Sequence, residues 1–69
     1  MIYRKIINLL KMKVNSLAVG DFLPTENELA NLYNISRNTL RKALKELEFE
    51  GLIERKHGSG TRIKNKPFQ

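Results

Sequence analysis

The stretch that decides the fold lies at residues 25–49 and reads TENELANLYNISRNTLRKALKELEF. Thr25 followed three residues later by Glu28 forms a capping-box pattern, which predicts the start of a helix. Asn34 suits the left-handed residue that ends a short helix, and Ser36 is a good N-cap for the next one. Two helices joined by so short a turn predict a helix-turn-helix.

Apolar residues recur at helical spacing in both halves of this stretch. In the first helix we expect apolar, inward positions at Leu29, Ala30, Leu32 and Tyr33. The second helix is expected from Arg37 to about Phe49, and its buried stripe consists of Leu40, Ala43, Leu44 and Leu47. Gly51 follows it as a natural residue just beyond a helix end.

The flanking segments complete the predicted domain. Residues 2–15 read as an amphipathic helix with one apolar face, made of Ile2, Ile6, Leu9, Leu10 and Val14. Beyond Gly51, residues 52–56 and 61–63 are predicted strands, joined by a glycine-containing loop. The fold class is therefore α+β, mainly α: a winged helix-turn-helix of three helices plus a C-terminal β-hairpin wing. We expect this domain at residues 1–64, and we interpret residues 65–69 as a tail or the start of a linker to a further, effector-binding domain.

The charge of the 69-residue chain is strongly basic and unevenly distributed. A formal net charge of +6 indicates a polyanionic partner. Bases occupy residues 1–20, 35–45 and 55–66, whereas acids occupy residues 21–34 and 46–54. The absence of cysteine excludes a disulfide framework and a Cys-ligated zinc site. The single histidine, His57, is too few ligands for a metal centre, so we expect neither a metal nor a cofactor.

Several classes of protein are disfavoured by the pattern of residues. The apolar runs fall short of the roughly 20 residues that span a bilayer, and the N-terminus lacks the features of a signal peptide. We therefore expect a cytoplasmic protein with no membrane partner. The sequence contains no nucleophile–base pair, metal cluster or phosphate-cradling Gly-Lys loop, so we expect no enzyme activity.

The exposed face of the helix from Arg37 carries residues suited to reading DNA. Arg37, Asn38 and Arg41 lie together there, with Thr39 and Lys42 at the flanks. Arginine can bind the major-groove edge of guanine in a bidentate manner, and asparagine can bind adenine likewise. The alternative interpretation of this helix alone is a solvated charged face.

The hairpin favours the DNA-binding interpretation. Its small-residue tip, with Gly58 and Gly60, is surrounded by cationic or titratable side chains, namely Arg55, Lys56, His57, Arg62 and Lys64. Such a tip could lie on phosphates or enter a minor groove. His57 also has a simpler interpretation as a turn or surface histidine. Lysines 5, 42, 56 and 64 are expected to contact phosphates, which contribute affinity without selectivity.

Taken in order, these segments resemble the GntR family of bacterial regulators. The resemblance covers about Tyr3 to Ile63 and rests on GDFLPTE (20–26), ELA (28–30), ISR (35–37), LRKAL (40–44), EGLI (50–53) and GSGT (58–61). The Pro-Thr-Glu and Arg-Lys-Ala-Leu forms lean toward the HutC-like branch.

The resemblance implies roles for individual residues. The arginines that match Arg37 and Arg41 contact major-groove bases or phosphates in the family. The positions of Ser36, Asn38 and Thr39 add base and phosphate contacts. In the family, the wing tip that matches His57, Gly58 and Gly60 enters the minor groove. The threonine that matches Thr61 lies close to the DNA backbone.

Two positions depart from the family pattern. Asn27 stands where an arginine often contacts DNA, which puts that contact in doubt, and Arg62 replaces an apolar residue and adds a candidate phosphate contact. Thr25, Asn27 and Lys5 are retained as further candidate contacts.

The partners implied are double-stranded DNA, as a palindromic operator, and a second copy of the protein. A repressor that dimerises and binds a small-molecule effector through a C-terminal domain is the leading hypothesis. The alternative is a winged-helix protein–protein interaction module that uses the acidic row Glu46, Glu48, Glu50 and Glu54. Binding of structured RNA is less favoured, because the aromatic residues are scattered and mostly expected at core-like positions: Tyr3, Phe22, Tyr33, Phe49 and Phe68.

Overall fold

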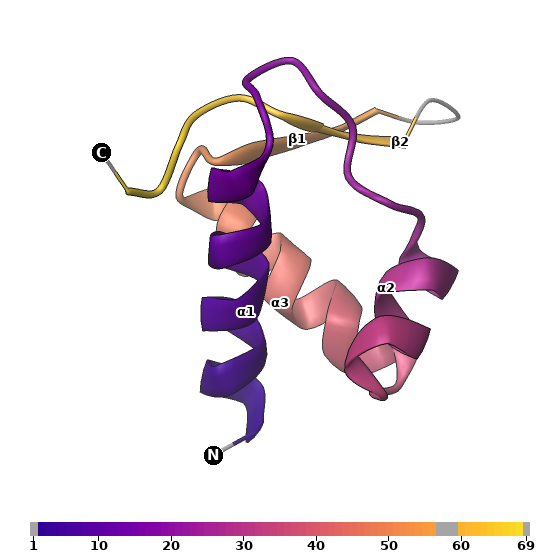
Figure 1. The fold of residues 1–69 in the computed structure, drawn as a ribbon. Helices are drawn as coiled ribbons and strands as arrows, with labels where there is room; N and C mark the ends of the chain where they lie inside the picture. Colours follow the sequence, from indigo (N-terminus) through magenta and orange to yellow (C-terminus); the bar gives the residue numbers. More distant parts are fainter. Residues whose placement is uncertain (1, 57–59, 69) are drawn as a thin grey trace.

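The computed structural model describes residues 2–56 and 60–68. Its elements follow the order α1 (Ile2–Ser16), α2 (Glu26–Tyr33), α3 (Arg37–Phe49), β1 (Ile53–Lys56) and β2 (Gly60–Ile63). Figure 1 shows α1 beside α3, α2 against the first turns of α3, and the two strands across the C-terminal ends of α1 and α3. Three helices followed by an antiparallel hairpin confirm the predicted winged helix-turn-helix.

The ends of α2 and α3 form as the capping residues predict. The Thr25 hydroxyl accepts from the Glu28 backbone N–H at 3.2 Å, and the Glu28 carboxylate accepts from the Thr25 N–H at 3.0 Å. Asn34 takes the left-handed conformation with φ 55°, and the Ser36 hydroxyl accepts from the Thr39 N–H at 3.2 Å. These local hydrogen bonds set the tight turn that fixes α2 against α3.

The core is formed by aliphatic side chains from every element. Leu10 and Val14 of α1 and Leu29 of α2 are buried. They pack with residues of α3 and the hairpin, which include Leu40, Ala43, Leu44, Leu47, Ile53 and Ile63. Because α3 contributes to contacts with α1, α2 and β1, it is the central element of the domain.

Several apolar side chains lie outside this core, contrary to prediction. Leu32 has 62% of its surface exposed, Phe22 53%, Phe49 91% and Phe68 49%. At 100° per residue, Leu32 is turned about 110° from the middle of the face of α2 that packs inward. Phe49 lies on the side of α3 opposite its leucine stripe, so helical spacing agrees with its exposure, and the expectation of a core-like position rested on its aromatic character alone.

The segment before α2 pairs with the wing, a feature that the sequence did not predict. Phe22 forms an isolated antiparallel bridge with Arg62. The Leu23 N–H donates to the Thr61 carbonyl at 2.9 Å, and the Ile63 N–H donates to the Asp21 carbonyl at 2.9 Å. The chain therefore lies along β2 before it enters α2, which ties the wing to the start of that helix.

Residues after β2 pack back on the domain. The Asn65 side chain donates to the Gly51 carbonyl at 3.1 Å. The Lys66 ammonium donates to the carbonyls of Asn15 (2.6 Å) and Leu17, at the C-terminal end of α1. The domain boundary after residue 64 stays a prediction. Among the residues described, no helix combines the length and apolar character needed to cross a bilayer.

Candidate nucleic-acid interface

The first half of α3 presents the predicted polar residues to solvent. Arg37, Asn38, Arg41 and Lys42 are exposed, and Thr39 is half-buried. The Ser36 hydroxyl caps the start of α3, and it also donates to the Thr39 hydroxyl at 2.9 Å. The structure thus brings the predicted readers onto one helix end, with Ser36 and Thr39 engaged in its cap.

One carboxylate connects this helix to the wing. The Oε1 atom of Glu26, in the first turn of α2, accepts from the Arg41 Nε atom at 3.0 Å. The Oε2 atom of the same carboxylate pairs with the guanidinium of Arg55 on β1. The Glu26 side chain is 21% exposed, whereas that of Arg41 is 51% exposed. Elements α2, α3 and β1 therefore meet at a single acid with two arginines.

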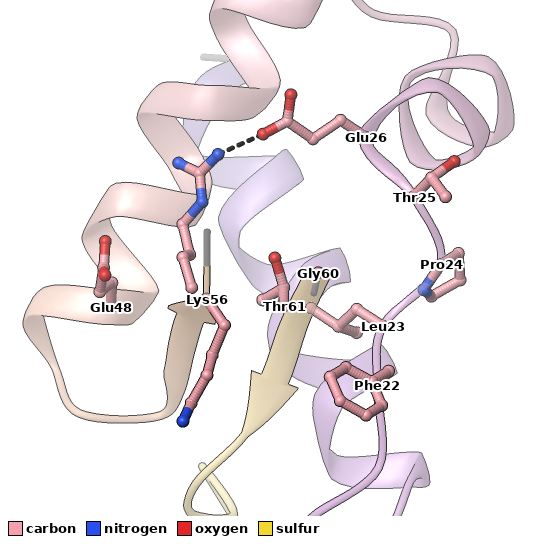
Figure 2. A pocket seen from close by; sticks show the side chains of 10 residues that line it. Phe22, Leu23, Pro24, Thr25, Glu26, Glu48, Lys56, Gly60 and Thr61 are labelled. Atoms are coloured by element: carbon pink, nitrogen blue, oxygen red, sulfur yellow. Dashed lines mark hydrogen bonds and ion pairs between the residues drawn. The ribbon is translucent and has the colours of Figure 1, made fainter. Parts of the chain in front are cut away.

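An open cleft lies between the start of α2 and the wing, as Figure 2 shows. Its lining includes Glu26, Lys56, Gly60 and Thr61 together with the chain from Phe22 to Thr25. Gly60 has a φ of 98°, which disfavours a side chain there, and a Cβ atom would lie 3.7 Å from the Phe22 ring. The cleft therefore places the cationic residues of the wing next to the N-terminal end of α2.

The remaining candidate residues are less concentrated. Arg62 is exposed on β2 opposite Glu54. Lys5 is exposed near the start of α1, where the Tyr3 hydroxyl donates to the Lys42 carbonyl at 3.0 Å. Asn27 is exposed in α2, and the Thr25 hydroxyl is held in the cap. His57 and Gly58 lie outside the described residues.

The two acids at the start of α2 have separate roles. Hydrogen bonds from the Thr25 backbone N–H and then from its side chain hold the pKa of Glu28 below its ordinary value of 4.5. Glu28 is thus the capping carboxylate, and Glu26 is left to bridge the arginines. From the sequence, Glu26 is assigned only to the acidic segment 21–34 and to the motif GDFLPTE, and Arg55 is not among the candidate contacts. Glu26 lies 15 positions from Arg41 and 29 positions from Arg55 in the sequence, so no local pattern indicates these ion pairs.

Comparisons with known proteins agree with this geometry. The chain is 42% identical over 66 residues to the HTH-type transcriptional regulator GgaR of Escherichia coli strain K12, which covers 93% of the chain and 27% of GgaR. It is 45% identical over 50 residues to a probable fructoselysine utilization operon transcriptional repressor of the same strain, covering 72% of the chain and 21% of the repressor. The chain thus spans about a quarter of the length of these relatives.

A solved structure extends the likeness to the fold. The crystal structure of AraR(DBD) in complex with operator ORX1 superposes with a TM-score of 0.83 at 32% identity, covering 88% of this chain and 76% of that one. The family model for bacterial regulatory proteins of the gntR family matches residues 2–63. The chain belongs to the GntR family of bacterial regulatory proteins.

Proposed function

We propose that this chain binds double-stranded DNA in a sequence-specific manner, with α3 in the major groove and the wing in the adjacent minor groove. The observation that carries the proposal is the meeting of Arg41 on α3 and Arg55 on β1 at Glu26, because it places both basic elements on one surface. Arg37 and Asn38 precede Arg41 on the exposed side of α3, where they can reach base edges. Lys56 and Arg62 supply charge for phosphates.

We further propose that two copies occupy an inverted-repeat operator and repress transcription. Palindromic sites reflect the two-fold symmetry of a protein pair. The operator-bound AraR(DBD) neighbour and the repressor name of one relative support this proposal. Dimerisation and response to a small-molecule effector would depend on a C-terminal domain, which the greater length of the relatives supports. Such a regulator would act in the bacterial cytoplasm.

The experiment that tests DNA recognition is selection of bound duplexes from a randomised pool. It is run at about 0.15 M salt, where sequence-independent phosphate binding is weakened. We expect enrichment of a short inverted repeat. Retention of DNA without an enriched motif would leave only general binding, and no retention would favour the protein–protein interaction module.

Two variants with the same loss of charge provide a matched control for the selection. Arg37→Gln removes an exposed cation from the first turn of α3, and Lys13→Gln removes a half-buried cation from the last turn of α1. We expect the first variant to lose or alter the enriched motif and the second to keep it. The same motif from both variants would contradict the assignment of the reading surface.

A further inference from the structure

The position of Glu26 on the cationic surface of the domain needs a physical reason. Glu26 lies between Arg41 and Arg55, where approaching phosphates would be repelled by its charge. The helix does not require this acid for its cap, because Thr25 and Glu28 already form both hydrogen bonds of the capping box. Glu26 therefore opposes the binding of phosphates and is not needed for the cap. These two facts suggest that it has another role.

The hydrogen-bond geometry indicates what that role is. Glu26 accepts from the Nε atom of Arg41, and among the described residues the Nη groups of Arg41 form no hydrogen bond. A guanidinium is a rigid, planar fork, so fixing its Nε–H restricts the direction of the remaining donors. The other carboxylate oxygen holds Arg55, and Figure 2 shows Glu26 reaching from the start of α2 toward the wing.

We propose that Glu26 is a positioning residue that sets the sequence preference of the domain. It aims the Nη groups of Arg41 at a base edge and, through Arg55, fixes the wing relative to α3. This inference rests on the proposed DNA-binding function and adds a residue that determines its specificity. Glu26 contributes selectivity at the expense of affinity for phosphates.

This role predicts opposite effects on two kinds of DNA. When Glu26 is replaced by glutamine, a negative charge leaves the surface, so binding to random-sequence duplex stays equal or becomes tighter. Glutamine has one acceptor oxygen and no charge, so it cannot hold Arg41 and Arg55 together as the carboxylate does, and binding to the duplex that the wild-type chain selects becomes weaker. We expect the ratio of the two affinities to fall roughly tenfold, within the discrimination that one bidentate base contact provides.

The test measures the affinity of the 69-residue chain for the selected duplex and for a scrambled duplex of equal length. The variants are Glu26→Gln and Glu46→Gln, which remove the same charge. Glu46 is exposed on α3 one turn before Glu50, the partner of Lys11 on α1, so it serves as the matched control. We expect Glu46→Gln to keep the wild-type ratio. If Glu26→Gln folds poorly, Glu26→Asp keeps the charge but shortens the reach, and the ratio should still fall.

A double replacement separates positioning from direct contact. If Glu26 acts through Arg41, Glu26→Gln causes a clearly smaller loss of preference in the Arg41→Gln background than in the wild-type chain, and only the part that passes through Arg55 remains. Additive losses would overturn the proposal and assign Glu26 to direct reading, since a carboxylate can accept from cytosine N4. Equal weakening on both duplexes, or an unchanged ratio, would also overturn it. A wild-type chain without any preference would instead refute the proposed function itself, and the inference with it.

Discussion

The two sides of α3 differ in what they contact. Toward α1, the helix meets buried Leu10 and Val14, and Glu50 at its C-terminal end pairs with Lys11 of α1 at 3.2 Å. Toward α2 and the wing, it meets a carboxylate shared by two arginines. One helix thus separates its tasks by side: apolar burial against α1 provides stability, and oriented charge against α2 and the wing forms the surface that we propose contacts DNA.

The largest expected effect lies on the α1 side. Leu10→Ala removes a fully buried side chain and should lower the free energy of unfolding by about 2–5 kcal/mol. Urea denaturation measures this change, and Leu32→Ala, at an exposed position, is the control with an expected change within about 0.5 kcal/mol. The fraction of Leu10→Ala that remains folded should keep its duplex preference. Equal destabilisation by both variants would break the division between the two sides.

The second effect lies on the other side of the helix. Arg41→Ala should weaken binding to the selected duplex by about 1–3 kcal/mol while leaving scrambled duplex much less affected. Lys64→Ala, exposed just after β2, should weaken both duplexes similarly, because a phosphate contact carries no sequence information. Fluorescence anisotropy measures the four affinities. The same pattern of loss for the two variants would show that Arg41 does not read bases.

A smaller effect is expected from the ion pair on the α1 side. A double-mutant cycle with Lys11→Gln and Glu50→Gln should give a coupling free energy of about 0.2–1 kcal/mol, as for other exposed pairs. The duplex preference of both variants should equal that of the wild-type chain. A change in preference would mean that α1 also shapes the reading surface.

The smallest effect is a pH dependence at the start of α2. The pKa of Glu28 is lowered in the folded state by the hydrogen bonds from Thr25, so its ionised form stabilises the fold above about pH 4.5. That stabilisation is lost as the pH falls through the lowered folded-state pKa. The stability difference between wild-type and Glu28→Gln should therefore shrink below pH 4.5, as followed by urea denaturation. Glu46→Gln, outside the capping box, is the control, and a difference for Glu28→Gln that is constant with pH would contradict the assignment.

Sequence could predict the features that depend on local chemistry. The ends of α2 and α3 follow from Thr25, Glu28, Asn34 and Ser36, because each acts on backbone groups only a few residues away. The leucine stripe of α3 follows from helical periodicity, and it is buried as expected. The same periodicity gave no reason for Leu32 to be exposed, since α2 is too short for its pattern to define one face.

The features that sequence did not predict depend on tertiary neighbours. Glu26 bridges partners 15 and 29 residues away, so its role depends on how α2, α3 and β1 pack together. The pairing of Phe22 with Arg62 depends on the path of the chain before α2, which Pro24 indicates only as extended.

An NMR titration of the isotope-labelled chain with the selected duplex shows directly which side of α3 faces DNA. We expect amide resonances to change most at residues 36–42 at the start of α3, at residues 25–27, and at residues 55–56 and 60–62 of the wing. Resonances around Lys11 and Glu50, on the α1 side, should change least. Changes concentrated around Lys11 and Glu50, with the start of α3 unaffected, would contradict the account.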